Sequence, residues 1–96
     1  MSPLRTLVEA HRTEIKGAAA RHRGRGIALF GSVARGDDTE RSDIDFLVEF
    51  EENSSLFDLV RLKDRLGDLL SRDVDVVSLG GLKERDHDIR ADAVWL

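Results

Sequence analysis

The sequence predicts a compact α/β domain, in which helices and strands alternate along 96 residues. Apolar residues recur at helical spacing in residues 3–23 and 55–71. Three shorter segments are apolar throughout or alternate apolar with polar residues, namely residues 27–31, 43–50 and 73–79. A chain of this length can bury one modest hydrophobic core, so we expect a single domain that spans residues 1–96.

The first helix is expected over residues 3–23. Ser2 and Pro3 are typical of an N-cap followed by the first helical position. His11 lies on the apolar face, where a hydrogen-bonded structural histidine is favoured over a catalytic one. The segment "RHRGRG" then places basic residues at the helix C-terminus, where the helix dipole favours them, and its Gly24 or Gly26 can end the helix.

The next two elements are strands joined by a polar loop. "IALFG" predicts a short buried strand that ends at a Gly31-Ser32 turn, and a brief helical turn follows. "DIDFLVEF" alternates, so that one face of its strand is wholly apolar and must pack against helices: Ile44, Phe46, Val48 and Phe50. The opposite face carries Asp43 and Asp45 at the beginning of the strand.

The C-terminal half is expected to add a helix, a strand and a last helix. Ser55 and Asp58 fit a capping box that opens a helix running to about residue 71. Its expected apolar stripe consists of Leu56, Leu59, Val60, Leu62, Leu66, Leu69 and Leu70. "DVDVVSL" predicts the third strand, which "GG" ends, and residues 82–96 are expected to form a helix with few apolar anchors. In that helix Trp95 either packs into the core or forms a docking surface.

Composition and charge exclude several classes of protein. No stretch of 18 apolar residues is present, and the N-terminus lacks the apolar middle of a signal peptide, so we expect a cytoplasmic protein without a membrane span. The absence of cysteine excludes disulfides, thiol catalysis and zinc–thiolate sites. The net charge is +5 over residues 1–36 and −9 over residues 37–96. This balance favours a small anionic ligand or a charged protein partner over direct nucleic-acid binding, although the basic residues could also merely solvate a helix.

Two aspartates predict a metal site. Asp43 and Asp45 point to the same face of a strand, with Cα atoms roughly 6.5–7 Å apart. Like charges repel, so we expect positive charge between them, and Mg²⁺ prefers such oxygen ligands. Asp75 would add a third carboxylate if its strand is adjacent, although Asp73 shares its face and competes for this role. Two cations held by three such acids are suited to in-line phosphoryl-type displacement.

A glycine-serine turn predicts a phosphate site next to these acids. The backbone N–H groups after Gly31, the hydroxyl of Ser32 and the guanidinium of Arg35 could all contact phosphate oxygens. The chain contains no P-loop motif, no complete EF-hand loop and no H-E-x-x-H zinc motif. The segment G-S-V-A-R is also no nucleophile elbow, so a serine hydrolase is not expected.

The combined pattern resembles a known superfamily. Gly31-Ser32, ten intervening residues and Asp43-Ile44-Asp45 match the G-S-x10-D-x-D pattern of DNA polymerase β-like nucleotidyltransferases. The strings "FGSVARG", "SDIDFLVEF", "SLFDLVRLKDRL" and "RDVDVVSL" resemble the minimal nucleotidyltransferase (MNT) family, whose members are typically antitoxins paired with HEPN-domain ribonuclease toxins. The resemblance implies a small mixed β-sheet flanked by helices, the polymerase β palm-like fold.

The same resemblance implies a function. It implies transfer of AMP from ATP to a hydroxyl, in some members a tyrosine of the toxin, with two magnesium ions. Asp43, Asp45 and Asp75 would hold the metals, and Asp75 would also activate the acceptor hydroxyl. Gly31 and Ser32 would hold the nucleotide phosphates.

Chain length favours a protein acceptor. Relatives that act on nucleic acids or antibiotics use additional domains, for which 96 residues leave no room. We therefore expect a hetero-oligomer with a HEPN toxin. Two alternatives stay open: an antitoxin that blocks its toxin by binding alone, and a small-molecule nucleotidyltransferase that works with a separate acceptor-binding subunit.

Overall fold

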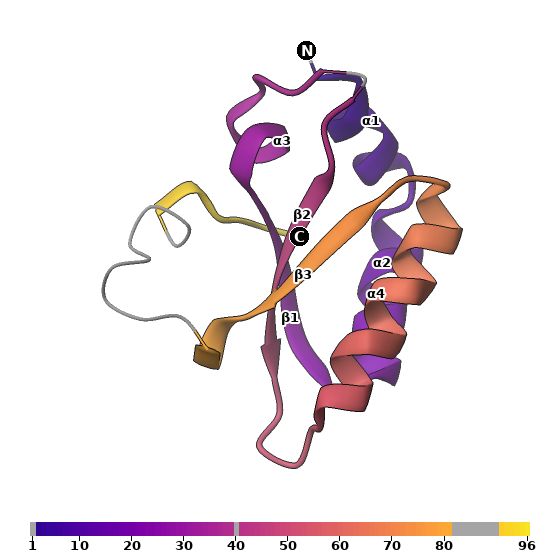
Figure 1. The fold of residues 1–96 in the computed structure, drawn as a ribbon, viewed down its shortest axis with the longest axis vertical. Helices are drawn as coiled ribbons and strands as arrows, with labels where there is room; N and C mark the ends of the chain where they lie inside the picture. The colour runs from indigo at the N-terminus through magenta and orange to yellow at the C-terminus, as the bar shows by residue number, and fades with distance from the viewer. Residues whose placement is uncertain (1, 40, 82–90) are drawn as a thin grey trace.

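The computed structural model describes residues 2–39, 41–81 and 91–96, and within them a mixed sheet has the strand order β3-β2-β1-β4 (Figure 1). The strands are β1 (Gly24–Phe30), β2 (Ile44–Phe50), β3 (Val74–Ser78) and β4 (Val94–Trp95). β1 pairs antiparallel with both β2 and β4, whereas β2 pairs parallel with β3. The predicted small mixed sheet is therefore confirmed.

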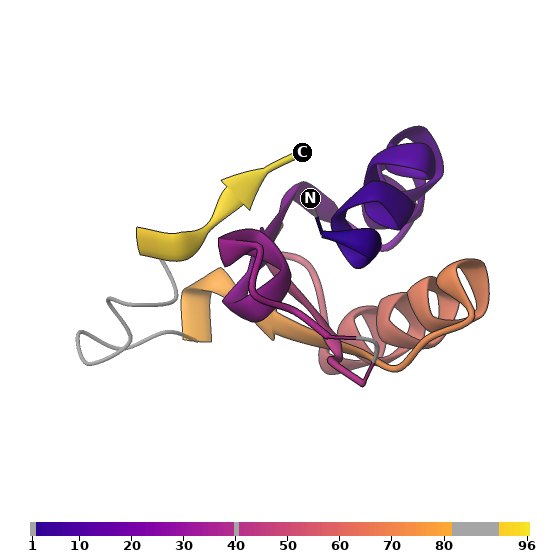
Figure 2. The ribbon, with the colours of Figure 1, turned by 90° about the horizontal axis from the view of Figure 1, so that it is seen from above.

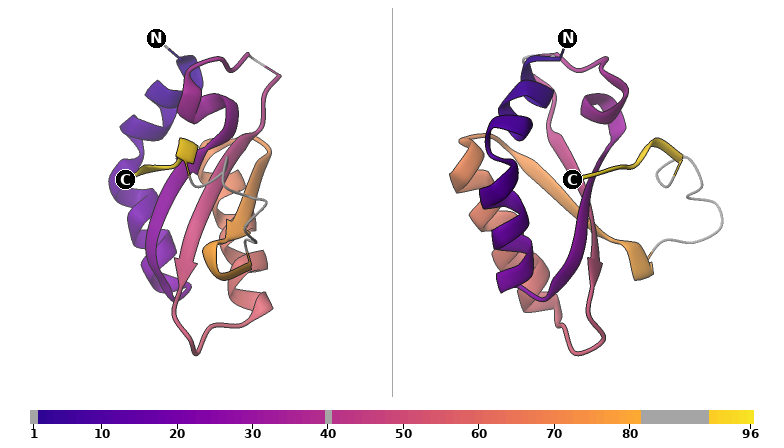
Figure 3. Two further views of the ribbon diagram at one scale, coloured as in Figure 1. Left: turned by 90° about the vertical axis from the view of Figure 1, so that its left-hand side faces the viewer. Right: turned by 180° about the vertical axis from the view of Figure 1, so that it is seen from behind.

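Three helices cover one face of this sheet (Figures 2 and 3). They are α1 (Pro3–Ala10), α2 (Arg12–Arg21) and α4 (Leu56–Leu70), and α2 packs on β1 while α4 packs on β3. A short helix, α3 (Gly31–Arg35), follows β1 directly. The opposite face of the sheet carries a smaller apolar cluster around Ala28, Phe30 and Leu47.

The expectation of one helix over residues 3–23 is wrong at His11. α1 ends at Ala10 and α2 begins at Arg12, because His11 leaves the helical conformation with φ −112° and ψ 18°. The imidazole Nδ1 of His11 lies 3.0 Å from the carbonyl oxygen of Leu7, a distance at which its Nδ1–H tautomer donates a hydrogen bond. The hydrogen bond expected of a structural histidine is therefore present. α2 also stops before the glycines, since Arg23 already has a left-handed φ of 65°.

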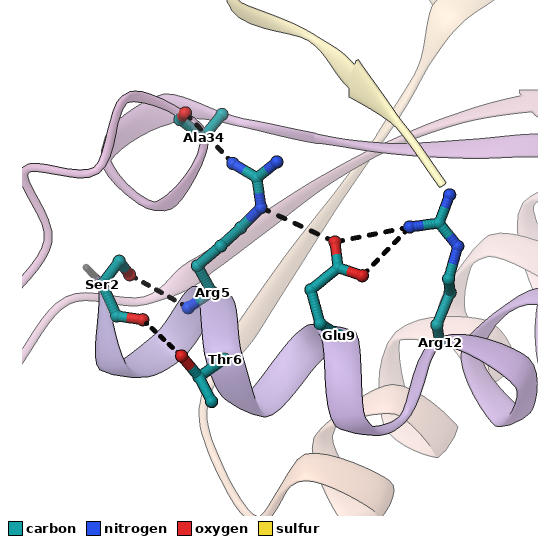
Figure 4. A network of polar contacts seen from close by, with 6 residues as sticks. All are labelled: Ser2, Arg5, Thr6, Glu9, Arg12 and Ala34. Carbon is teal, nitrogen blue, oxygen red and sulfur yellow. Dashed lines mark hydrogen bonds and ion pairs between the residues drawn. The ribbon is translucent and has the colours of Figure 1, made fainter.

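Polar contacts hold α1 in place and connect it to α3 (Figure 4). The predicted N-cap is confirmed, because the backbone N–H of Arg5 donates to Ser2 Oγ at 2.9 Å. The Arg5 guanidinium also donates to the carbonyl oxygen of Ala34 at 3.4 Å, which ties α1 to α3. Glu9 contacts both Arg5 and Arg12 and so spans the break between α1 and α2. The N-terminal helices thus support the segment that begins at the predicted phosphate turn.

The alternation in β2 has the predicted effect. Ile44, Phe46 and Val48 are fully buried in the core against the helices. Leu47 points to the other face of the sheet and joins the smaller cluster. Burying an aliphatic or aromatic side chain of this size contributes about 1.5–3 kcal/mol, so this strand fixes which face of the sheet the acids can occupy.

α4 begins as predicted but presents fewer apolar residues to the core. The capping box is confirmed, since the backbone N–H of Ser55 donates to Asp58 Oδ2 at 2.9 Å. The buried stripe consists of Leu62, Leu66 and Leu70. Leu56 and Val60, which the stripe was expected to include, are 74% and 46% exposed. At 3.6 residues per turn, Val60 lies about 120° around the helix axis from the centre of the buried stripe.

The C-terminus differs from the expected helix over residues 82–96. Residues 82–90 lie outside the described residues, and a short helix (η1, Leu79–Gly81) follows β3. Val94 and Trp95 form strand β4, because the free edge of β1 offers hydrogen-bonding groups that a terminal helix would leave unpaired. Trp95 covers Gly26 and remains 47% exposed, so it is partly packed and partly open to solvent.

Candidate active site

The three predicted acids come from two neighbouring strands. Asp45 on β2 lies directly opposite Asp75 on β3 in the parallel register, so the expected adjacency of these strands is confirmed. Asp43 stands two residues ahead of Asp45, at the entrance to β2. Asp73 precedes β3, and its carbonyl oxygen accepts a hydrogen bond from Ile44 N at 3.2 Å, which joins the entrances of the two strands.

The half-buried carboxyl of Asp45 is the electrostatic centre of this group. Burial is the main cause that raises the pKa of Asp45, and the nearby charges of Asp75 and Asp43 raise it further. The charge of Arg35 opposes this rise. The register places Asp75, and not Asp73, opposite Asp45, and these charges describe a site that gains stability from added positive charge.

Gly31 allows the Asp45 carboxylate to lie against the main chain. Gly31 has a left-handed φ of +72°, and a Cβ at this position would lie 2.5 Å from Asp45 Oδ2. Any side chain here would both strain the backbone and displace the carboxylate. Because α3 starts at Gly31, the predicted phosphate turn with Ser32 and the predicted metal-binding acid are in direct contact.

Arg35, which was expected to bind phosphate, is held by two acids. Its Nη1 lies 2.9 Å from Asp92 Oδ2, and its Nε lies 3.2 Å from Asp37 Oδ2. The hydrogen bond to Asp92, and to a smaller extent the one to Asp37, raises the pKa of Arg35, so the guanidinium stays charged. Asp92 was missed by the sequence analysis, because 57 residues separate it from Arg35 and no motif connects the two.

Lys63 is a second residue that the sequence analysis missed. Its Nζ lies 3.7 Å from Asp75 Oδ1, and it reaches this acid from α4. The two side chains are 49% and 62% exposed, so the ion pair contributes little to stability. Lys63 is therefore a positive charge near Asp75, as Arg35 is near Asp45.

The donor set fits a hard divalent cation. Carboxylate oxygens are the ligands that Mg²⁺ prefers, and the missing Cβ of Gly31 leaves the Asp45 oxygen accessible beside the main chain. Within the described residues, no three acidic or histidine side chains lie close enough to enclose an ion as they stand. The exposed side chains of Asp43 and Asp75 can rotate, so binding a cation would draw them towards Asp45.

Fold and site together define a nucleotidyltransferase. Residues 12–94 match the family model described as a nucleotidyltransferase domain, and the chain belongs to this family. It is 39% identical over 83 residues to MJ0128 of Methanocaldococcus jannaschii, which is provisionally named a protein adenylyltransferase, covering 86% of this chain and 82% of that protein. It is 37% identical over 83 residues to the protein adenylyltransferase MntA of Thermococcus cleftensis, covering 86% of this chain and 81% of that protein.

Solved structures agree with this family. A structure described as a provisional minimal nucleotidyltransferase superposes with a TM-score of 0.86 at 40% identity, covering all of this chain (100%) and 97% of the other. A toxin–antitoxin complex with AMP-PNP contains a chain that superposes with a TM-score of 0.74 at 23% identity, covering 86% of this chain and 69% of the other. A chain in the complex of a tri-AMPylated Shewanella oneidensis HEPN toxin with an MNT antitoxin superposes with a TM-score of 0.68 at 20% identity, covering 91% of this chain and 69% of the other. At these last two identities the likeness establishes the fold alone.

These comparisons confirm the predicted family, the polymerase β-like fold and the enzyme class, since the named relatives are protein adenylyltransferases. The roles of individual residues stay predictions. In the part of the chain that the structure describes, no helix combines the length and apolar character needed to span a membrane.

Proposed function

We propose that this chain transfers AMP from ATP to a hydroxyl, most simply a tyrosine hydroxyl, of a partner HEPN-domain ribonuclease toxin and thereby neutralises it. The observation that carries the proposal is the direct register of Asp45 and Asp75, with Asp45 seated against Gly31. A chain of the complex between a tri-AMPylated HEPN toxin and an MNT antitoxin has the fold of this chain, and this likeness supports the choice of partner. Because ATP is the donor, the reaction would take place in the predicted cytoplasm.

The proposed reaction is a single displacement at the α-phosphorus of ATP. The acceptor oxygen forms a bond to this phosphorus while the bond to the β-phosphate oxygen breaks, and pyrophosphate leaves with the electron pair of that bond. The proton of the acceptor hydroxyl passes to a carboxylate. Asp75 is suited to this role, because it is exposed on an edge strand where an acceptor can approach it.

The remaining residues bind and orient the substrate. The backbone N–H groups that follow Gly31, with the Ser32 hydroxyl, would hold the β- and γ-phosphates. Arg35 would add a charge to these phosphates after exchanging its contact with Asp92. Asp43, Asp45 and Asp75 would hold two Mg²⁺ ions, which when bound supply the positive charge that offsets both the acids and the phosphates.

Mass spectrometry of the co-expressed HEPN partner tests the proposal. A HEPN-domain protein encoded next to this chain should gain the mass of one AMP or of a multiple, and Asp43→Asn should abolish the gain. Wild-type chain that leaves a verified, bound partner unmodified in the presence of ATP and magnesium would sink the transfer reaction. If Asp43→Asn still protects cells from the toxin, neutralisation is by binding alone.

A further inference from the structure

A groove with a volume of about 780 Å³ lies beside the acids at the edge of β3. It is lined by residues 41–43 before β2, by residues 71–74 at the start of β3, and by residues 63, 64, 67 and 68 of α4. Asp43 lines it directly, and Lys63, which also lines it, contacts Asp75. The groove therefore borders the group of three acids at Asp43, and Lys63 connects it to Asp75.

One wall of this groove is fixed by contacts between the segments that enter β2 and β3. The guanidinium of Arg72 donates to the carbonyl oxygen of Ser42 at 3.4 Å. The backbone N–H of Ile44 donates to the carbonyl oxygen of Asp73 at 3.2 Å. These two contacts connect the segments of the wall, so a ligand would lose little binding energy in ordering it.

The charges in the groove favour a polypeptide over a nucleotide. Among the described lining residues, the charged side chains are of both signs, and the acids are in excess: Arg41, Lys63, Arg72, Asp43, Asp64, Asp68 and Asp73. Asp43 belongs to the proposed metal site, and the other six charges balance, three of each sign, so the groove offers a triphosphate no net positive charge. Val74 is the one apolar residue in this described lining, and it is buried, so an apolar ligand would find little to contact. Interspersed charges of both signs are instead suited to a protein surface with polar and charged side chains.

The direction from which the acceptor hydroxyl attacks the α-phosphorus also favours a polypeptide in the groove. In Figure 1, α3 lies on the β1 side of β2, whereas α4 lies on the β3 side. The residues that line the groove belong to α4 and to the segments that enter β2 and β3, so the groove lies on the β3 side as well. In an in-line displacement the attacking oxygen and the leaving pyrophosphate occupy opposite sides of the phosphorus. If the β- and γ-phosphates lie at Gly31 and Ser32, the attacking hydroxyl must approach from the β3 side.

We propose that this groove seats the segment of the partner protein that carries the acceptor hydroxyl, an inference that rests on the proposed transfer of AMP to a protein. Asp64, Gly67 and Asp68 on the exposed side of α4 then contact the acceptor protein and not the nucleotide. Gly67 leaves room for this segment, because it has no side chain on a turn of α4 that borders the groove.

The substitution Gly67→Leu tests the proposal by filling the groove. A Cβ at Gly67 would meet its nearest neighbour, the Arg72 carbonyl oxygen, at 3.4 Å, and leucine favours a helix over glycine. Gly17→Leu is the matched control, since Gly17 also lies inside a helix, on α2, with no atom within 4 Å of its Cβ position. The measurements are AMP transfer to the HEPN partner as its concentration is varied, and binding of AMP-PNP with magnesium.

We expect Gly67→Leu to raise the KM for the partner by at least about tenfold and to leave the affinity for AMP-PNP unchanged. Gly17→Leu should leave both quantities unchanged. Wild-type kinetics for Gly67→Leu would overturn the proposal, and so would a loss of AMP-PNP binding, which would place the nucleotide in the groove. If Gly67→Leu does not fold, Asp64→Lys on the same wall provides the same comparison.

If the wild-type chain binds the partner but transfers no AMP, the proposed reaction fails while the groove can still be tested by calorimetry. Weaker partner binding by Gly67→Leu would then support the groove as the docking site. Equal binding, or no binding by the wild-type chain, would overturn it.

Discussion

Replacing Gly31 by alanine tests whether the Asp45 carboxylate must lie against the main chain. The φ of Gly31 is +72°, and the new Cβ would lie 2.5 Å from Asp45 Oδ2. A left-handed conformation costs an L-residue about 1–2 kcal/mol. The carboxylate must also retreat from 2.5 Å to at least 3.0 Å, the closest approach that Cβ atoms show.

The two effects have different readouts. Each kcal/mol lost lowers the Tm of a domain of this size by about 4–8 °C, which circular dichroism would measure. Displacing a catalytic group by about 1 Å can lower a rate about 100-fold, so a retreat of about half that distance should lower AMP transfer about tenfold. Transfer would be measured with labelled ATP at a temperature where the variant is folded.

Gly36→Ala separates backbone strain from displacement of the carboxylate. Gly36 also has a left-handed φ, +80°, but no atom lies within 4 Å of its Cβ position. We expect a similar loss of Tm with transfer activity close to that of the wild type. Equal activities for Gly31→Ala and Gly36→Ala would refute the reasoning.

Three further substitutions test the electrostatics and the core. Asp45→Asn should raise the Tm of the metal-free protein at pH 7, because burial and neighbouring acids raise the pKa of this carboxyl. A raised pKa means that protonation of Asp45 favours the folded state, so the stability gained from protonation is present below about pH 3.9 and is lost as the pH rises through the raised pKa. The difference in Tm between variant and wild type should therefore vanish in acid. A lower Tm for the variant at pH 7 would contradict the raised pKa. Asp92→Asn should tighten AMP-PNP binding about two- to fivefold by releasing Arg35, whereas an unchanged affinity in calorimetry would mean that Arg35 does not contact the nucleotide. Leu66→Ala, in the core, should cost about 2–5 kcal/mol in urea unfolding, and Leu56→Ala, 74% exposed, should change stability by less than about 0.5 kcal/mol; similar losses would contradict the observed burial.

Features that depend only on residues close together in the sequence could be predicted. The alternation in β2 predicted which side chains are buried, and the spacing of Asp43 and Asp45 predicted two acids at one end of that strand. The capping box of α4 also formed as expected, because a cap depends only on neighbouring residues. These features are encoded within a few positions of one another.

Contacts between distant segments could not be predicted in this way. Val94 and Trp95 form a strand because β1 has a free edge, which a local pattern does not reveal. The ion pairs of Lys63 with Asp75 and of Arg35 with Asp92 depend on how α4 and the C-terminal segment pack. Two neighbouring acids imply positive charge nearby, but their spacing does not reveal which side chains the fold brings to them.

The parallel pairing of β2 with β3 also determines when this site can exist during folding. Parallel neighbours need a long crossover, which here runs through α4, whereas β1 and β2 are joined by a shorter connection. Closing the longer loop costs more conformational entropy, and the contacts between β2 and β3 form only after the loop has closed. Asp75 would therefore reach Asp45 late in folding. A chain that has not completed its sheet thus holds an unfinished set of ligands, and incompletely folded molecules would be inert towards ATP.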